Sequence, residues 1–226
     1  MNRLEFEDDK NWRSRGYLPH YDASDKYQMI TYRLADALPK SVLRDLDAGS
    51  AGVSPAQRNI EKRKCLENYL DQSYGSCIFK KPECAQLVID AWRYFDGQRY
   101  DLLAYVVMPN HVHVLIKTYE AYSLKDIVHS WKSFTSHEIY KILKDDCAGE
   151  TPALPADKSL ELIDKKYLKG KVWQEEYWDR FIRDQNHLNR AVEYIMNNPV
   201  KAGLCKRTNG WRWSATLANK QGFKGF

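Results

Sequence analysis

Residues 101–118 read DLLAYVVMPNHVHVLIKT, and this stretch decides the fold. It holds two runs rich in β-branched and aromatic residues, Asp101–Met108 and His111–Thr118, which are joined only by Pro109-Asn110. Two apolar runs separated by two residues predict a tight β-hairpin, and Pro-Asn suits a type I or II turn better than the primed types. The chain should therefore contain at least one pair of antiparallel strands.

Other strand and helix patterns surround this hairpin. Strands are expected over 27–34 and 172–182, and helices over 54–71, 82–95, 123–143 and 186–197. Asn198-Pro199 should end the last helix, because the residue before a proline is disfavoured in the helical conformation. Residues 145–158 contain one glycine and two prolines and are expected to form a loop. The mixture predicts an α+β fold, an antiparallel sheet with helices on one face.

Composition bounds the class of protein. A chain of 226 residues with 43% hydrophobic and 29% charged residues is typical of one globular domain, which excludes disordered and collagen-like classes. No apolar run is long enough for a membrane helix, and the start does not resemble a signal peptide, so a cytoplasmic location is expected. The five cysteines show no CxxC spacing, which argues against a disulfide framework and a thiolate zinc site.

Charge is concentrated near the C-terminal end. Residues 185–226 hold seven Lys or Arg and one acid, Glu193. Such a segment is typical of a surface that binds phosphate groups. A solvated basic tail explains the charge equally well.

The pair His111 and His113 is the first candidate site. On a strand, residues i and i+2 face the same side, roughly 6.6 Å apart along the chain, so both imidazoles can approach one divalent cation. Two polar residues on the wet face of a strand are the alternative interpretation. Two histidines do not complete a metal site, so a third ligand must come from elsewhere in the chain.

Tyr194 and Asn198 form the second candidate site. Residues i and i+4 share one face of a helix, so the tyrosine hydroxyl and the amide oxygen should point the same way. The oxygen of Asn198 is then a candidate for the missing ligand, and Tyr194 for a group that reaches a phosphate. Simple packing of the tyrosine ring remains the alternative.

At this point a family resemblance becomes apparent. Residues 105–116, YVVMPNHVHVLI, resemble the metal-binding strand pair of the single-tyrosine HUH transposases, and more specifically that of the bacterial REP-associated tyrosine transposases. Four further stretches match that group's pattern in the same order: 17–20 leading into 31–36, 127–135, 173–180 and 193–204. The resemblance covers residues 17–215, which is nearly the whole chain.

The resemblance implies a fold and a site. It implies one HUH domain over 1–226, with a ferredoxin-like (RRM-like) core over 17–204, the HUH strand at its centre, and a basic tail over 205–226. It implies that His111 and His113 bind Mg2+ or Mn2+ and that Tyr194 is the nucleophile. Related transposases have a Gln ligand four residues after the tyrosine, where this chain has Asn198, so the ligand role of Asn198 stays open.

The resemblance also implies an activity: cleavage and rejoining of single-stranded DNA near REP-like hairpins through a 5′-phosphotyrosine intermediate. The expected partner is the DNA hairpin, with no obligate protein partner, and the expected state is a nucleoid-associated monomer, with a dimer as the alternative. Two other functions stay open, a metal-dependent phosphodiesterase that uses water and a hairpin-binding protein without chemistry. The candidate DNA contacts are Lys132, Arg180, Lys201, Lys206, Arg207 and Arg212.

Overall fold

The computed structural model describes residues 12–14, 19–22, 25–39, 42, 64–148 and 170–217. Its centre is an antiparallel sheet of five strands in the order β6-β3-β5-β4-β7. The strands are β3 (Tyr27–Arg33), β4 (Tyr100–Val107), β5 (His111–Thr118), β6 (Trp178–Phe181) and β7 (Ser214–Thr216). A separate pair is formed by β1 (Trp12–Ser14) and β2 (Pro19–Tyr21). The α+β class is therefore confirmed, and the strand with both histidines is central.

The expected hairpin is β4–β5. The backbone N–H of Met108 donates to the carbonyl of His111 at 2.9 Å and closes the turn. Two neighbouring segments fix the turn in place: the N–H of Leu34 donates to the carbonyl of Asn110 at 2.9 Å, and that of Phe79, in the 3-10 turn η1 (Ile78–Lys80), donates to the carbonyl of Pro109 at 3.2 Å. The turn next to His111 is thus held by backbone bonds from both sides.

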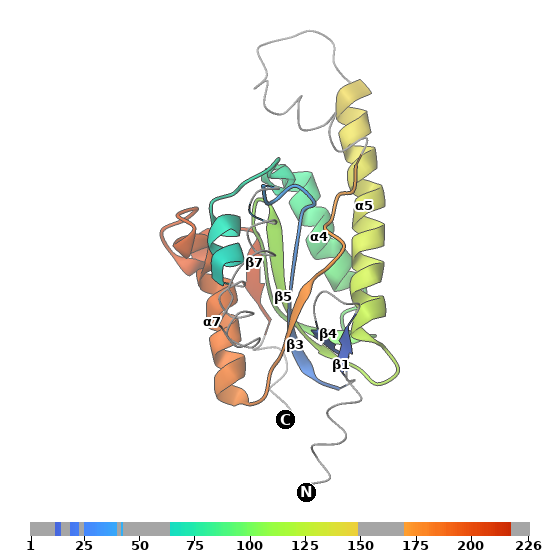
Figure 1. Ribbon diagram of the computed structural model, residues 1–226, viewed down its shortest axis with the longest axis vertical. Coiled ribbons are helices and arrows are strands. Elements are labelled where there is room, and N and C mark those ends of the chain that lie inside the picture. The colour runs from blue at the N-terminus through green and yellow to red at the C-terminus, as the bar shows by residue number, and fades with distance from the viewer. Residues whose placement is uncertain are drawn as a thin grey trace, which may run out of the picture.

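One face of the sheet is covered by α4 (Pro82–Tyr94) and α5 (Leu124–Ala148), which lie side by side (Figure 1). Val112, Val114 and Ile116 alternate along β5 and point into this layer, where Trp92 and Trp131 are almost fully buried. Side chains alternate along a strand, so the same pattern sends His111 and His113 to the opposite face. The hydrophobic core between the sheet and the α4–α5 layer is the larger of the two cores formed by the described residues.

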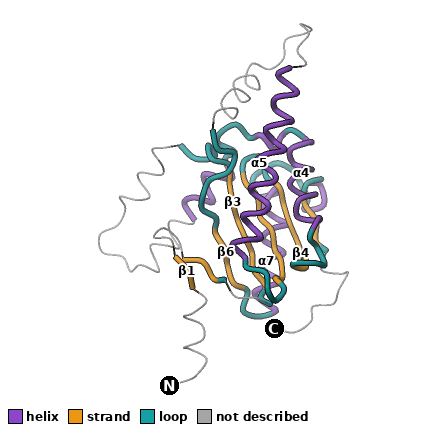
Figure 2. The backbone as a smooth tube through the Cα atoms, turned by 90° about the vertical axis from the view of Figure 1, so that its right-hand side faces the viewer, coloured by secondary structure: helices purple, strands orange, loops and turns teal. Residues whose placement is uncertain are grey.

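The opposite face carries α7 (Gln185–Lys201), as Figures 1 and 2 show from two directions. Its buried residues Leu188, Ala191 and Ile195 pack in one cluster with Val106 and Leu115 of the sheet. The expectation of helices on one face therefore holds for α4 and α5 but not for α7. The apolar residues of α7 pack against the face of the sheet that carries the histidines.

The expected end of α7 before Pro199 is wrong, because the helix runs through Pro199 to Lys201. A proline inside a helix removes one N–H donor. Here only a short remainder follows, and its carbonyls are satisfied by the chain that leaves the helix: Ala202 N–H donates to Asn198 at 3.0 Å, and Leu204 N–H donates to Pro199 at 2.9 Å. At the other end, the Asp184 side chain accepts from His187 N–H at 2.7 Å, which caps the first turn.

Residues 205–217, expected as part of a basic tail, include a 3-10 turn η2 (Thr208–Gly210) and the edge strand β7. Trp213 is buried in the α4–α5 core, and the N–H of Leu217 donates to the carbonyl of Leu103 at 2.7 Å. The sheet therefore extends beyond residue 204.

Smaller differences concern element lengths. The strand expected over 172–182 is shortened to β6, preceded by a single bridge between Leu34 and Trp173. The helix expected to end at residue 143 continues to Ala148, so 145–148 are helical, and 149–158 lie outside the described residues. The start of the helix expected over 54–71 also lies outside them, while 64–71 are helical. Within the described ranges, no helix combines the length and apolar character needed to cross a membrane.

Candidate functional site

The imidazoles of His111 and His113 meet on the α7 face of the central strand. Their ring centroids are 4.9 Å apart, with planes at 85°, and each side chain is 1% exposed. The two imidazoles therefore lie next to each other in the protein interior and are not exposed to solvent. The interpretation of the two histidines as an exposed polar pair is therefore excluded by their burial.

Each ring uses its Nδ1 atom in a hydrogen bond inside the protein. Nδ1 of His111 lies 2.7 Å from Oδ1 of Asn110, and Nδ1 of His113 lies 2.7 Å from Oγ1 of Thr31 on the neighbouring strand. Nδ1–H of His111 donates to the amide oxygen of Asn110, so Nε2 of His111 is unprotonated. Nε2 of His113 faces the amide nitrogen of Asn198, whose N–H it accepts. Fixing one ring nitrogen in this way is how proteins prepare an imidazole to bind a cation through the other.

Both imidazoles are held in the neutral form. Burial, followed by the charges of His113 and Lys201, lowers the pKa of His111 well below its ordinary value. Burial and the charge of Lys201 lower the pKa of His113 to about 3. A neutral imidazole is the form that coordinates a metal ion, so these two side chains need lose no proton to do so.

Asn198 brings a third donor to the histidines. Its Nδ2 lies 3.2 Å from Nε2 of His113, and the residue is 1% exposed. Its Oδ1 is buried and has no hydrogen-bond partner among the described residues. An unpaired buried oxygen costs free energy, and this one belongs to the ligand type that the two imidazoles lack. The residues present therefore fit a divalent cation, although no group of three or more His, Cys, Asp or Glu in the described part of the chain does so.

Tyr194 lies one helical turn before Asn198 on the same face of α7. Its ring packs edge-on against that of His113, with centroids 5.2 Å apart and planes at 80°. It lines an open pocket of about 290 Å3 together with Asn198 and Lys201. Burial, and then the charges of Glu67 and Asp71, raise the pKa of the phenol above its usual value, while a hydrogen bond with Asn198 acts the other way. The phenol is therefore protonated and reachable from solvent.

Most of the predicted DNA contacts lie on the α7 side of the sheet or in the segment that follows α7. Lys201 forms an ion pair with Asp71 at 2.7 Å at the end of α7, and Arg180 lines a small cavity on the same face of the sheet. Lys206, Arg207 and Arg212 are exposed in the segment that follows α7.

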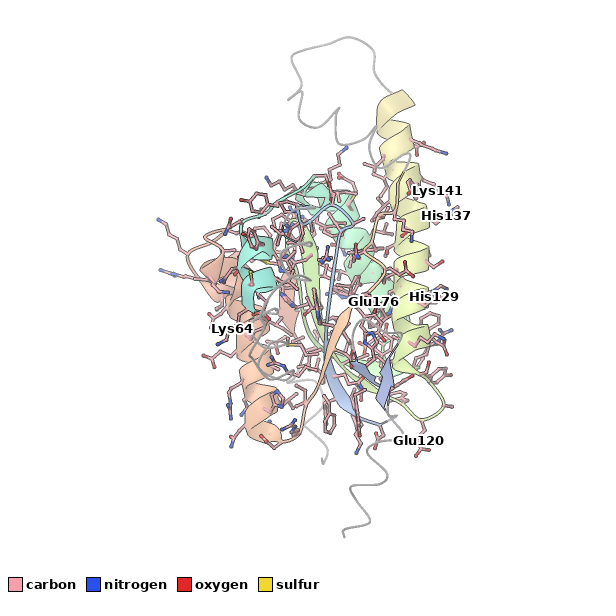
Figure 3. All side chains as sticks on the ribbon, viewed as in Figure 1. Lys64, Glu120, His129, His137, Lys141 and Glu176 are labelled. Atoms are coloured by element: carbon pink, nitrogen blue, oxygen red, sulfur yellow. The ribbon has the colours of Figure 1, made fainter. Side chains whose placement is uncertain are left out.

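Lys132 lies elsewhere, on α5 at the opposite face of the sheet. Its Nζ donates to the backbone carbonyls of Gln174 and Glu175, each at 2.6 Å. The structure thus ties Lys132 to the loop before β6 and does not bring it to the histidines. His129 and His137, on the outer side of the same helix, likewise point away from the sheet (Figure 3).

Two positioning residues were not predicted from the sequence. Thr31 and Asn110 fix the ring nitrogens of His113 and His111, yet no role was assigned to either of them. Both lie within stretches that matched the family pattern, and that match is the only signal that pointed to them. Their importance depends on strand register, which pairs Thr31 with His113.

A second cluster joins two of the matched stretches that lie far apart in the chain. Nδ1 of His20 contacts Asp179 at 2.5 Å, and its Nε2 lies 3.2 Å from Glu176, which Figure 3 places beside β6. The Tyr21 N–H also donates to Asp179, at 2.8 Å, and Tyr177 stacks on the His20 ring. This cluster attaches β2 to β6 and contains none of the residues around Tyr194.

Part of the chain that holds this site is similar to known proteins. Residues 77–148, which run from η1 to the end of α5 and include both histidines, match the family model "Transposase IS200 like". A "REP-associated tyrosine transposase" of Escherichia coli is 27% identical over 115 residues, 51% of this chain and 53% of the relative. A Haemophilus influenzae protein that is provisionally named a REP-associated tyrosine transposase is 25% identical over 119 residues. The match covers 51% of this chain and 58% of the relative. The chain thus spans somewhat more than half the length of these relatives.

Among solved structures, a REP-associated tyrosine transposase bound to a REP hairpin aligns with 88% of this chain and 81% of its own, at 17% identity and a TM-score of 0.47. The family model and the named relatives agree with the resemblance carried by the sequence motifs. Residues 77–148 are therefore similar to the IS200-like transposases, and about half of the chain is similar to REP-associated tyrosine transposases.

Proposed function

We propose that this chain is a metal-dependent, single-tyrosine transposase that cleaves and rejoins single-stranded DNA near REP-like hairpins. The observation that carries the proposal is the meeting of Tyr194 and Asn198 of α7 with His111 and His113 of β5. His113 and Asn198 are 85 positions apart in sequence, and packing of a tyrosine against a core would not require two neutral imidazoles beside it.

The donor set proposed for Mg2+ or Mn2+ is Nε2 of His111, Nε2 of His113 and Oδ1 of Asn198. Imidazole suits Mn2+ better than Mg2+, so we expect Mn2+ to support the higher activity in vitro. When bound, such a cation neutralises charge on the phosphate oxygens and favours ionisation of a nearby phenol. That second effect matters here, because burial raises the pKa of Tyr194.

In the proposed reaction, Oη of Tyr194 attacks a phosphorus atom of the strand. The Oη–P bond forms, the P–O3′ bond breaks, and the strand is left with a free 3′-hydroxyl and a 5′-phosphotyrosine. The phenol proton leaves to solvent through the open pocket, and the departing 3′ oxygen takes up a proton. The phosphotyrosine keeps the energy of the phosphodiester, so a later 3′-hydroxyl can attack it and rejoin the strand without a nucleotide cofactor.

The testing experiment is incubation of the full chain with a labelled single-stranded hairpin DNA and Mn2+. We expect a covalent protein–DNA adduct whose mass maps to Tyr194. Cleavage without an adduct that persists in Tyr194→Phe would support the phosphodiesterase that uses water. Hairpin binding without cleavage under any divalent metal would support the binding protein without chemistry.

A further inference from the structure

Arg33 is a buried cation on the histidine side of the sheet that the proposed reaction does not use. It is 5% exposed, and its Nε and Nη1 atoms are buried without a hydrogen-bond partner among the described residues. A buried charge without a partner is costly, and proteins normally pair it with a carboxylate or saturate it with hydrogen bonds. The position of Arg33 therefore calls for a ligand that this part of the chain does not supply.

Strand register places Arg33 directly beside the candidate metal ligands. Arg33 of β3 pairs with His111 of β5, and Thr31, two residues earlier, pairs with His113. Paired residues of neighbouring strands share one face of the sheet, so Arg33, His111 and His113 all start from the α7 face. Arg33 is thus attached to the same two strands that hold the imidazoles.

The guanidinium is held in place without the use of those two donors. Its Cζ lies 5.9 Å from the ring centroid of Trp178 on β6, within the range of a cation–π contact. That contact leaves the buried Nε and Nη1 donors unpaired, so a ligand that reaches them must enter beside Trp178. Burial alone lowers the pKa of Arg33, to about 10, and no neighbouring carboxylate contributes. Arg33 therefore stays charged at neutral pH.

We propose that Arg33 binds a phosphate group of the nucleic-acid strand, next to the phosphate that Tyr194 attacks. A guanidinium with unpaired donors matches the oxygens of a carboxylate or a phosphate, and a nucleic-acid strand supplies the phosphate. Trp178 lies on β6 and the imidazoles lie on β5, with β3 between them, so Arg33 holds a neighbouring phosphate and not the attacked one. This inference rests on the proposed function for the identity of the strand.

The test compares Arg33→Met and Arg33→Lys with the unchanged full chain in EDTA, so that neither metal nor cleavage contributes. The control is Arg99→Met, because Arg99 also stacks on a ring, with Cζ 3.4 Å from the Phe95 centroid, but belongs to the turn before β4. The first readout is the Kd for a six-residue oligothymidylate as a function of salt. The second is the melting temperature with inorganic phosphate, against chloride at the same ionic strength.

We expect Arg33→Met to raise the oligonucleotide Kd about tenfold or more and to lower the salt slope by roughly 0.7. Its melting temperature without ligand should be equal to or higher than that of the unchanged chain, since an unpaired buried charge is gone. Stabilisation by phosphate should disappear in this variant and persist in Arg99→Met. A response to the oligonucleotide but not to inorganic phosphate still supports the site and assigns it to the strand.

Three results would overturn the inference. The first is a Kd and salt slope in Arg33→Met equal to those of the unchanged chain. The second is an equal loss in Arg99→Met, which would indicate a general charge effect. The third is a lower melting temperature that Arg33→Lys restores without any change in binding, which would make Arg33 a structural residue. A failure of the proposed function can be distinguished from these results. It would appear as absence of the Mn2+-dependent adduct in the unchanged chain, whatever Arg33 binds.

Discussion

The central sheet separates two layers that differ in how their buried polar atoms are hydrogen-bonded. On the α4–α5 face, large aromatic side chains are buried with their polar atoms paired. Nε1 of Trp92 donates to the hydroxyl of Tyr32 and Nε1 of Trp131 donates to that of Tyr100, both at 2.9 Å. Tyr100 in turn donates to the Trp92 carbonyl at 2.6 Å. Such pairing lets bulky rings fill a core without a penalty for their N–H and O–H groups.

The residues around the histidines on the α7 face are buried to a similar degree, but not all of their polar atoms have hydrogen-bond partners. Oδ1 of Asn198 and two nitrogens of Arg33 are buried without partners among the described residues, and burial lowers the pKa of both imidazoles, which keeps them neutral. Each unpaired group costs on the order of 1–3 kcal/mol. On the α4–α5 side Oε1 of Gln28, which pairs with Ile116, is also buried without a partner among the described residues, so the contrast concerns the aromatic core on one side and the cluster around the histidines on the other. We infer that the aromatic core of the α4–α5 face serves stability, while the polar cluster on the α7 face is available to a ligand. Five measurements test this division, beginning with the largest expected effect.

Substitution of Tyr194 by phenylalanine should eliminate the covalent adduct, because only the attacking oxygen is removed, while hairpin binding remains. The measurement is gel separation of labelled DNA after incubation with Mn2+. Tyr94→Phe is the matched control, since Tyr94 is a 71% exposed tyrosine at the end of α4 and should keep full activity. An adduct of normal yield in Tyr194→Phe would remove the chemical role from the α7 face.

On the other face, Trp131→Ala should lower the free energy of unfolding by about 3–5 kcal/mol, the usual cost of removing a large buried ring. Chemical denaturation measures it. Phe134→Ala, three residues further along α5, is the control, because Phe134 is 51% exposed and should cost far less. Equal losses in the two variants would contradict the view of this layer as the stabilising core.

Mn2+ should stabilise the folded chain through the α7 face. At a metal concentration about one hundred times the Kd, the gain is about 2.7 kcal/mol. His113→Ala should abolish this gain, because it removes one of two imidazole ligands. His129→Ala should keep it, because His129 is exposed on the outer side of α5. Thermal denaturation with and without Mn2+ compares each variant with itself, and an equal gain in His113→Ala would argue against the proposed ligand set.

The His20 cluster predicts a pH dependence of stability that belongs to neither the histidine pair nor Tyr194. Burial lowers the pKa of His20, but the hydrogen bonds and charges of Asp179 and Glu176 outweigh it, so the net pKa is raised above 6.5. A raised folded-state pKa means that the stabilisation is complete below pH 6.5 and is lost as the pH rises through the folded-state value. The stability difference between the unchanged chain and His20→Gln should therefore shrink as the pH rises above 6.5. A difference that grows over this range would contradict the assignment.

The smallest effect concerns the exposed basic residues after α7. Replacing Lys206 and Arg207 by glutamine should lower the salt slope for single-stranded DNA by roughly 0.7 for each phosphate that is no longer neutralised. Substitution is preferable to truncation, because β7 and Trp213 beyond them belong to the sheet and core. Lys141→Gln with Lys144→Gln, exposed on α5, is the control with equal reduction of charge. The same change of slope in both double variants would show only a net-charge effect.

The sequence by itself determined the elements with strong local patterns. The β4–β5 hairpin followed from two apolar runs around Pro109-Asn110, and α4 from its apolar spacing, since both signals are local. The family motifs also pointed to His111, His113, Asn198 and Tyr194 before any geometry was known. A local rule failed at Pro199, which lies within α7 although proline removes the hydrogen bond to the carbonyl of Ile195. Ile195, Asn198 and Pro199 are all buried, so packing of this part of α7 outweighs the local cost.

Only the tertiary structure decided which side chains meet and which are left unpaired. Alternation along β5 places the two histidines on one face, but it does not place α7 there. That position follows from the packing of Ile195 and its neighbours against the sheet. Register likewise decided that Thr31 would fix His113 and that Arg33 would lie beside His111. Burial without a partner depends on all surrounding elements at once, so no local pattern in the sequence reveals it.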